Sequence, residues 1–129
     1  MESVVKKVLL VEDDENIVRA LKDILEKAGI KVFQALDGKS GLDAALKERP
    51  DLIILDLQLP VLSGADFLKA LREDAWGKDA VVVAFTNVQT EESMIATREL
   101  GVKEYIVKSN WSAKEALNRA LIFIDVKID

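Results

Sequence analysis

Short apolar runs alternate along this chain with longer segments in which apolar residues recur every three or four positions. The short runs predict β-strands at residues 8–11, 30–35, 52–55, 80–85 and 105–107. The longer segments predict helices at residues 15–28, 38–48, around Phe67 to Leu71, at 91–100 and at 112–124. Because the strands are almost wholly apolar and alternate with helices, the pattern predicts an α/β fold. We expect a doubly wound parallel sheet of five strands, covered by five helices on both faces.

The alternation is not interrupted by a linker, a repeat or a low-complexity segment. We therefore expect a single domain over residues 1–129, with a core at about 7–124 and a short C-terminal tail at 125–129. Ser112 and Glu115 are spaced as a capping box for the last helix. In the tail, Val126 and Ile128 are apolar, which leaves open a partner contact, a dimer contact or a truncated linker.

Composition narrows the function classes. The net charge of −5 argues against a surface that binds nucleic acid, which would be basic. The absence of cysteine excludes disulfides and thiolate metal sites, and the absence of histidine excludes phosphohistidine on this chain. No apolar stretch approaches the ~20 residues that span a bilayer, and the start lacks a signal-peptide pattern. We expect a cytoplasmic protein with no membrane contact.

Polar residues follow four of the predicted strands. Glu12 and Asp13 come after the first strand, Asp56 after the third, Thr86 after the fourth and Lys108 after the fifth. In an open parallel sheet, ligands bind outside the carboxyl ends of the strands. The sequence thus predicts that three acids, a hydroxyl and an ammonium group meet at one edge.

Each of these residues also has an ordinary structural explanation. Asp13 or Asp14 could cap the first helix, Thr86 could be another cap, and Lys108 could be a solvated charge. Those explanations give no reason for the residues to share one edge. Clustered carboxylates repel one another unless a cation lies between them, and Mg²⁺ prefers such oxygen ligands.

Taken together, these residues resemble the motifs of response-regulator receiver domains of two-component signalling, from about Lys7 to Ile124. The matching residues are the acidic cluster Glu12, Asp13 and Asp14, the phospho-acceptor Asp56, the loop residues Pro60 and Gly64, the hydroxyl residue Thr86, the aromatic switch residue Tyr105 and the lysine Lys108. The resemblance implies a flavodoxin-like receiver fold with strand order 2-1-3-4-5.

The resemblance also implies a function. A sensor histidine kinase or a histidine phosphotransfer protein would pass a phosphoryl group to Asp56, with small acyl phosphates as substitutes. Mg²⁺ would be held by Glu12, Asp13, Asp56 and the backbone carbonyl of Gln58. Lys108 and Thr86 would contact the phosphoryl oxygens. The chain would not be an enzyme, beyond assisting its own phosphorylation and dephosphorylation.

For the output, the resemblance implies a switch formed by Thr86 and Tyr105. The signal would leave by protein contact through the face of the fourth helix, fifth strand and fifth helix, towards an unknown downstream protein. We expect no direct binding of nucleic acid, and either a monomer or a weak dimer strengthened by phosphorylation.

Several residues depart from the family pattern. Ser109 follows Lys108 where the family usually has a proline in a cis peptide, and a cis bond without proline costs ~2.5–4 kcal/mol. We therefore expect a differently built turn. Asn87 is larger than usual beside Thr86, and Gln58 and Val88 occupy positions that tune hydrolysis of the acyl phosphate.

Two other function classes fit less well. A phosphatase of the haloacid-dehalogenase type needs a second acid two residues after the nucleophile, where this chain has Gln58. A receiver-like binding module that never accepts phosphate would not need the complete set of acids, hydroxyl and lysine. A phosphorylation assay separates this module from a true receiver.

Overall fold

The computed structural model describes residues 4–128, which contain one parallel sheet. The strands are β1 (Lys7–Val11), β2 (Lys31–Ala35), β3 (Leu52–Leu55), β4 (Val82–Thr86) and β5 (Glu104–Val107). Their order is β2-β1-β3-β4-β5, and every neighbouring pair is parallel. The predicted fold class and strand order are confirmed.

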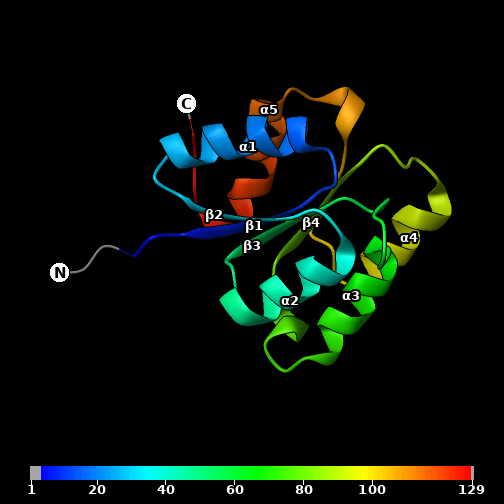
Figure 1. Cartoon of the computed structure of the whole chain (residues 1–129). Helices are drawn as coiled ribbons and strands as arrows, with labels where there is room; N and C mark the ends of the chain where they lie inside the picture. Colours follow the sequence, from blue (N-terminus) through cyan, green and yellow to red (C-terminus); the bar gives the residue numbers. More distant parts are fainter. Residues whose placement is uncertain (1–3, 129) are drawn as a thin grey trace.

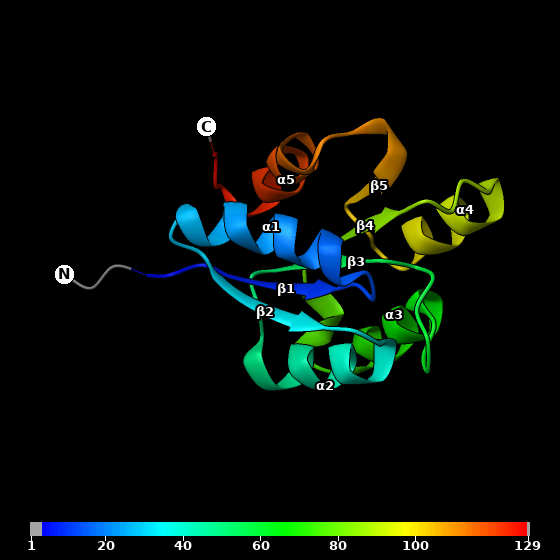
Figure 2. The ribbon, with the colours of Figure 1, turned by 45° about the horizontal axis from the view of Figure 1, so that its top comes forward.

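Helices cover both faces of this sheet. They are α1 (Glu15–Lys27), α2 (Gly38–Glu48), α3 (Gly64–Glu73), α4 (Glu91–Glu99) and α5 (Ala113–Leu121). Figures 1 and 2 show α1 and α5 on one face and α2 and α3 on the other, with α4 beside α3. Three 3-10 turns, Gly77–Asp79, Lys108–Asn110 and Ile122–Ile124, complete the described elements. Strand β4 begins at Val82, later than predicted, because the Ala80 N–H closes the turn before it by donating to Gly77 O.

The two helical layers explain why the strands are apolar at every position. In β1, Val8 and Leu10 pack in the cluster under α1 and α5, whereas Leu9 and Val11 pack in the cluster under α2 and α3. Successive side chains of a strand point to opposite faces, so a sheet covered twice needs apolar residues throughout. Strand β3 divides its side chains between the two clusters in the same way.

Side-chain caps fix where the helices begin. The capping residues are Asp14, Asp37, Ser63, Thr90 and Ser112, each of which accepts a hydrogen bond from a backbone N–H of the first turn. The predicted capping box of Ser112 and Glu115 is present. Since Asp14 caps α1 and Thr90 caps α4, neither Asp13 nor Thr86 serves as a cap. The capping explanation is therefore confirmed for Asp14 and wrong for Asp13 and Thr86.

The C-terminal tail folds back between α1 and α5. Asp125 adopts a left-handed conformation with φ of 59°, which reverses the chain. The Ile128 N–H then donates to Asn118 Oδ1 at 3.3 Å, and the Ile128 side chain is only 8% exposed within the α1–α5 cluster. Val126 packs against the same cluster. Ile128 therefore completes the core instead of offering an exposed surface to a partner, whereas a linker after it stays a prediction. Asp129 lies outside the described residues.

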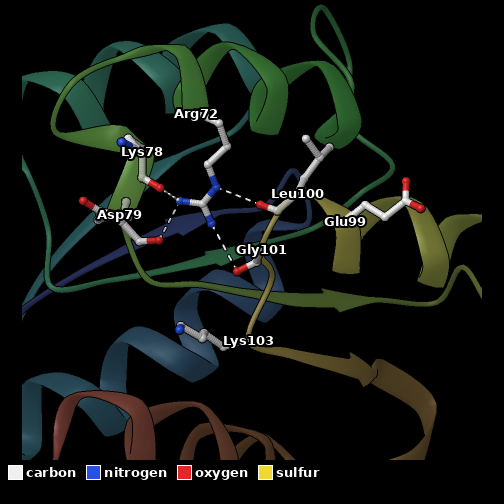
Figure 3. A pocket seen from close by; sticks show the side chains of 8 residues that line it. Arg72, Lys78, Asp79, Glu99, Leu100, Gly101 and Lys103 are labelled. Atoms are coloured by element: carbon white, nitrogen blue, oxygen red, sulfur yellow. Dashed lines mark hydrogen bonds between the residues drawn. The ribbon is translucent and has the colours of Figure 1, made fainter.

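Opposite the carboxyl edge, a hollow of about 410 Å³ lies near the starts of β4 and β5. Figure 3 shows the Arg72 guanidinium pointing towards the backbone around it. Its Nε donates to Leu100 O at 2.8 Å and its Nη1 donates to Ala80 O at 2.7 Å. Because the Arg72 guanidinium donates these hydrogen bonds to carbonyls of its own chain, it joins α3 to the segments before β4 and β5.

Candidate functional site

The strand register brings the predicted residues together at the carboxyl edge. Val11 pairs with Leu55, so Glu12 and Asp56 leave neighbouring strands side by side. The Asp56 N–H still donates to Val11 O at 2.9 Å, which fixes the start of the loop after β3.

Across the other half of the edge, Thr86 pairs with Val107. Lys108 is therefore the first residue beyond β5, one position past the level of Thr86 on the neighbouring strand. The topology alone thus places the acids and the lysine at one edge of the sheet, as the sequence predicted.

Lys108 forms ion pairs with two buried carboxylates. Its Nζ lies 2.9 Å from Asp56 Oδ2, and it also contacts Glu12 Oε1. Glu12 is 3% exposed and Asp56 is 5% exposed. Beneath the ammonium, the Phe85 ring centroid lies 5.7 Å away, so the ring supports the lysine from the core side. The sequence predicted that Asp56 and Lys108 share this edge, but it did not predict the pair with Glu12, because residue type and spacing do not show which acid reaches the lysine.

Burial and charge shift the proton affinities of this group. Burial raises the pKa of the Glu12 carboxyl to about 7; the Asp56 charge adds to the rise, and hydrogen bonds from Lys108 and the Asp14 N–H oppose it. Burial alone would lower the pKa of Lys108, but its bonds to Glu12 and Asp56 outweigh burial and raise that pKa. Two acids thus share a single ammonium group, and the Glu12 carboxyl binds a proton more readily than an ordinary glutamate does.

Three carboxylates are placed to share a cation. Glu12, Asp13 and Asp56 each offer an oxygen, and these oxygens lie within 4.8 Å of one another. Glu12 Oε1 is buried and accepts no hydrogen bond beyond its contact with the Lys108 ammonium. Asp13 is exposed, and it does not cap α1, because Asp14 is the capping residue. An all-oxygen set of this kind fits a hard divalent ion such as Mg²⁺.

The loop after β3 orients Asp56. The Gln58 N–H donates to Asp56 Oδ1 at 3.1 Å, while Lys108 holds Oδ2. Both carboxylate oxygens therefore have a partner and the group has a fixed direction. The backbone carbonyl of Gln58 as a metal ligand stays a prediction.

Thr86 and Tyr105 are linked through Val88, a connection that the sequence did not predict. Thr86 is fully buried, and its Oγ1 accepts the Val88 N–H at 3.2 Å. The Tyr105 hydroxyl donates to Val88 O at 2.6 Å and lies 3.3 Å from Ser93 Oγ. No side-chain pattern could reveal this, because Val88 acts through its backbone.

The chain passes from Lys108 into α5 without an unusual peptide. Among residues 4–128 there is no cis peptide bond, and Lys108–Asn110 forms a 3-10 turn. After this turn, the Trp111 ring lies 4.6 Å from the Arg119 guanidinium carbon. Ser109 is thus accommodated by a turn with trans geometry. In the same described part of the chain, no helix is long and apolar enough to cross a membrane.

Known proteins share this fold and sequence pattern. The chain is 38% identical over 104 residues to the alkaline phosphatase synthesis transcriptional regulatory protein PhoP of Bacillus subtilis, a match that covers 80% of this chain and 42% of that protein. It is 34% identical over 103 residues to the polar-differentiation response regulator DivK of Brucella anthropi, covering 80% of this chain and 84% of DivK. The chain spans less than half the length of the transcriptional regulators that it matches.

Among solved structures, the chemotaxis response regulator CheY4 of Vibrio cholerae superposes with a TM-score of 0.84 at 29% identity, covering 93% of this chain and 99% of that one. The family model described as the response regulator receiver domain matches residues 8–122. That match includes the site residues from Glu12 to Lys108. This chain therefore belongs to the response regulator receiver domain family of two-component signalling.

Proposed function

We propose that this chain accepts a phosphoryl group on Asp56, in the presence of Mg²⁺, from a sensor histidine kinase or a histidine phosphotransfer protein. The observation that carries the proposal is the pairing of Asp56 with Lys108 at 2.9 Å, beside Glu12 and Asp13. A carboxylate with a fixed direction, next to an ammonium and two further acids, is suited to phosphoryl transfer, in which positioning and electrostatics supply most of the catalysis.

In the proposed reaction, an Asp56 carboxylate oxygen attacks the phosphorus and the bond from phosphorus to the donor nitrogen breaks. The bonding pair leaves with the donor imidazole, and an acyl phosphate forms on Asp56. Lys108 would move from the carboxylate to a phosphoryl oxygen. The Thr86 hydroxyl, which accepts from the Val88 N–H, would donate a hydrogen bond to another phosphoryl oxygen.

The metal ligands in this proposal are Glu12, Asp13, Asp56 and the Gln58 carbonyl. The first three fit because their oxygens converge and because Glu12 holds a buried oxygen whose single contact is the lysine. When bound, Mg²⁺ would neutralise charge shared by the carboxylates and the phosphoryl oxygens. The chain would assist its own phosphorylation and dephosphorylation and no other reaction.

For the output, we propose protein contact through the face formed by α4, β5 and α5. A hollow of about 350 Å³ on this face is lined in part by Met94, Ile95 and Tyr105, so the proposed switch residue borders it. Met94 and Ile95 are 37% and 38% exposed, which suits an apolar contact. The downstream partner would be a protein in the cytoplasm, with no direct binding of nucleic acid. Residues 1–129 would act as one receiver domain, monomeric or weakly dimeric when phosphorylated.

Intact-protein mass spectrometry after incubation with acetyl phosphate and Mg²⁺ tests the proposal. We expect the wild type to gain one phosphate mass and Asp56→Asn to gain none. Asp51→Asn is the matched control, because Asp51 accepts the Lys7 N–H at the opposite edge of the sheet, and it should label like the wild type. Chelation of Mg²⁺ should suppress labelling. Labelling of Asp56→Asn at the wild-type rate would contradict the proposal.

A further inference from the structure

Val61 is an exposed apolar residue in an unfavourable conformation. Its side chain is 79% exposed, and its φ is 70°. Positive φ is a genuine outlier for a β-branched residue, and glycine or asparagine adopts it more easily. The Leu62 N–H donates to Pro60 O at 2.8 Å, so Val61 lies at the centre of a γ-turn of the rare, strained form. Packing within the chain does not offset this strain, because most of the side chain is in solvent.

The neighbouring helix holds this turn in place. The Gly38 N–H at the start of α2 also donates to Pro60 O, at 3.3 Å. A Cβ atom at Gly38 would lie 1.8 Å from Leu62 O, so only glycine allows α2 to approach the loop this closely. The turn that carries Val61 is therefore held in place by its contacts with the start of α2. Leu36, in the loop that leads into Gly38, is a second exposed apolar residue, with 40% of its surface accessible.

The position of Val61 indicates which kind of protein would cover its side chain. Val61 lies in the loop of residues 56–63 that joins β3 to α3, on the carboxyl edge of the sheet. Asp56 is only 5% exposed, so a phosphorylated side chain of a donor protein must enter from this edge. The donor surface around that side chain would then rest on the surrounding loops. A small acyl phosphate would reach Asp56 without touching them.

We propose that Val61 is an apolar anchor for the protein that donates the phosphoryl group, and that it contacts an apolar surface next to the donor's phosphohistidine. This inference rests on the proposed phosphorylation of Asp56. It adds a docking contact that phosphorylation by small molecules does not require. Burial of a strained, rigid side chain costs little further conformational entropy, so the anchor is already organised for binding.

Two phosphorylation routes separate docking from chemistry. The probes are acetyl phosphate and a purified histidine phosphotransfer domain, charged with radioactive phosphate and chosen from a panel as the fastest donor to the wild type. Val61→Asn removes the apolar side chain and tolerates positive φ, so it should melt no lower than the wild type. Val5→Asn is the matched control, since Val5 is 54% exposed and precedes β1 at the opposite edge.

We expect Val61→Asn to accept phosphate from acetyl phosphate at the wild-type rate, and from the donor domain about fivefold more slowly or worse at subsaturating concentration, the loss typical of an interface anchor. Val5→Asn should match the wild type in both assays. Wild-type transfer to Val61→Asn from the donor domain would overturn the anchor, and so would an equal loss by both routes. A wild type that accepts phosphate from neither probe would instead refute the proposed function.

Discussion

Thr86 and Tyr105 bind opposite sides of the same residue. Val88 donates its N–H to Thr86 Oγ1 at 3.2 Å and accepts the Tyr105 hydroxyl on its carbonyl at 2.6 Å. A movement of the Thr86 hydroxyl towards a phosphoryl oxygen would therefore disturb the residue that holds the tyrosine. The site at the sheet edge and the face made by α4 and β5 are connected by this short path.

Removal of the Thr86 hydroxyl should break this connection. In Thr86→Val the shape is kept and the hydroxyl is lost. We expect NMR signals of the Val88 amide and the Tyr105 ring to shift when beryllofluoride and Mg²⁺ are added to the wild type, and to stay nearly unchanged in the variant. Ser40→Ala is a suitable control, because it also removes a hydroxyl, but one that donates to Asp37 at the start of α2, away from Val88 and Tyr105. A full Tyr105 response in Thr86→Val would show that the signal takes another path.

The buried Glu12 should make stability depend on pH. Its pKa is about 7 in the folded chain against an ordinary value of 4.5, so between these values the folded state binds more protons than the unfolded state. The free energy of unfolding of the Mg²⁺-free protein should therefore fall as pH rises from about 4.5 to 7, with a slope from this group of at most ~1.4 kcal/mol per pH unit.

Urea unfolding across this pH range measures the effect. The slope should flatten in Glu12→Gln, and added Mg²⁺ should reduce it in the wild type, since the ion stabilises the carboxylate. A Glu12→Gln profile as steep as that of the wild type would assign the pH dependence to other groups.

Asp13 and Asp14 are neighbours with separable roles. Asp14 Oδ1 accepts the Asn16 N–H at 2.9 Å and caps α1, whereas the Asp13 carboxylate lies with the acids of the site. Asp13→Asn should weaken Mg²⁺ binding in calorimetry and leave the unfolding free energy nearly unchanged. Asp14→Ala should keep most of the Mg²⁺ affinity and lose about 0.5–2 kcal/mol of stability, the usual cost of a lost N-cap. The opposite assignment of the two effects would contradict the site geometry.

Two isoleucines near the C-terminus test the folded-back tail. Ile128 is 8% exposed in the α1–α5 cluster, whereas Ile122 is 66% exposed. Ile128→Ala should lower the unfolding free energy by about 2 kcal/mol, towards the low end for buried isoleucine because the residue is near the chain end. Ile122→Ala should change it by less than about 0.5 kcal/mol. Equal effects would mean that the tail does not pack as described.

The sequence predicts most of this fold because its two periodicities are clear. Each strand reads as a short apolar run and each helix as a three-to-four repeat, and the residues after the strands must then meet at one edge. The assignments failed where tertiary contacts decide. Ile128 looked like an exposed end residue, but the reversal at Asp125 returns it to the core.

The site shows the same limit. Residue type and spacing identify Asp56 and Lys108 as candidates, but they do not show that Lys108 also reaches Glu12. The link through Val88 depends on a backbone N–H and C=O, which every residue except proline possesses. Likewise, the positive φ of Val61 depends on the contact between the loop and α2, so the residue pattern does not predict it.

The account depends most on Asp56 as the residue that accepts phosphate, and trapping of the acyl phosphate tests this directly. The chain is incubated with acetyl phosphate and Mg²⁺, reduced with borohydride and digested, and the peptides are sequenced by mass spectrometry. Borohydride converts an aspartyl phosphate to homoserine and thus marks the modified residue. We predict homoserine at position 56 and at no other aspartate, and none when Mg²⁺ is chelated. Homoserine at Asp13 or another acid, with an intact Asp56, would contradict the account.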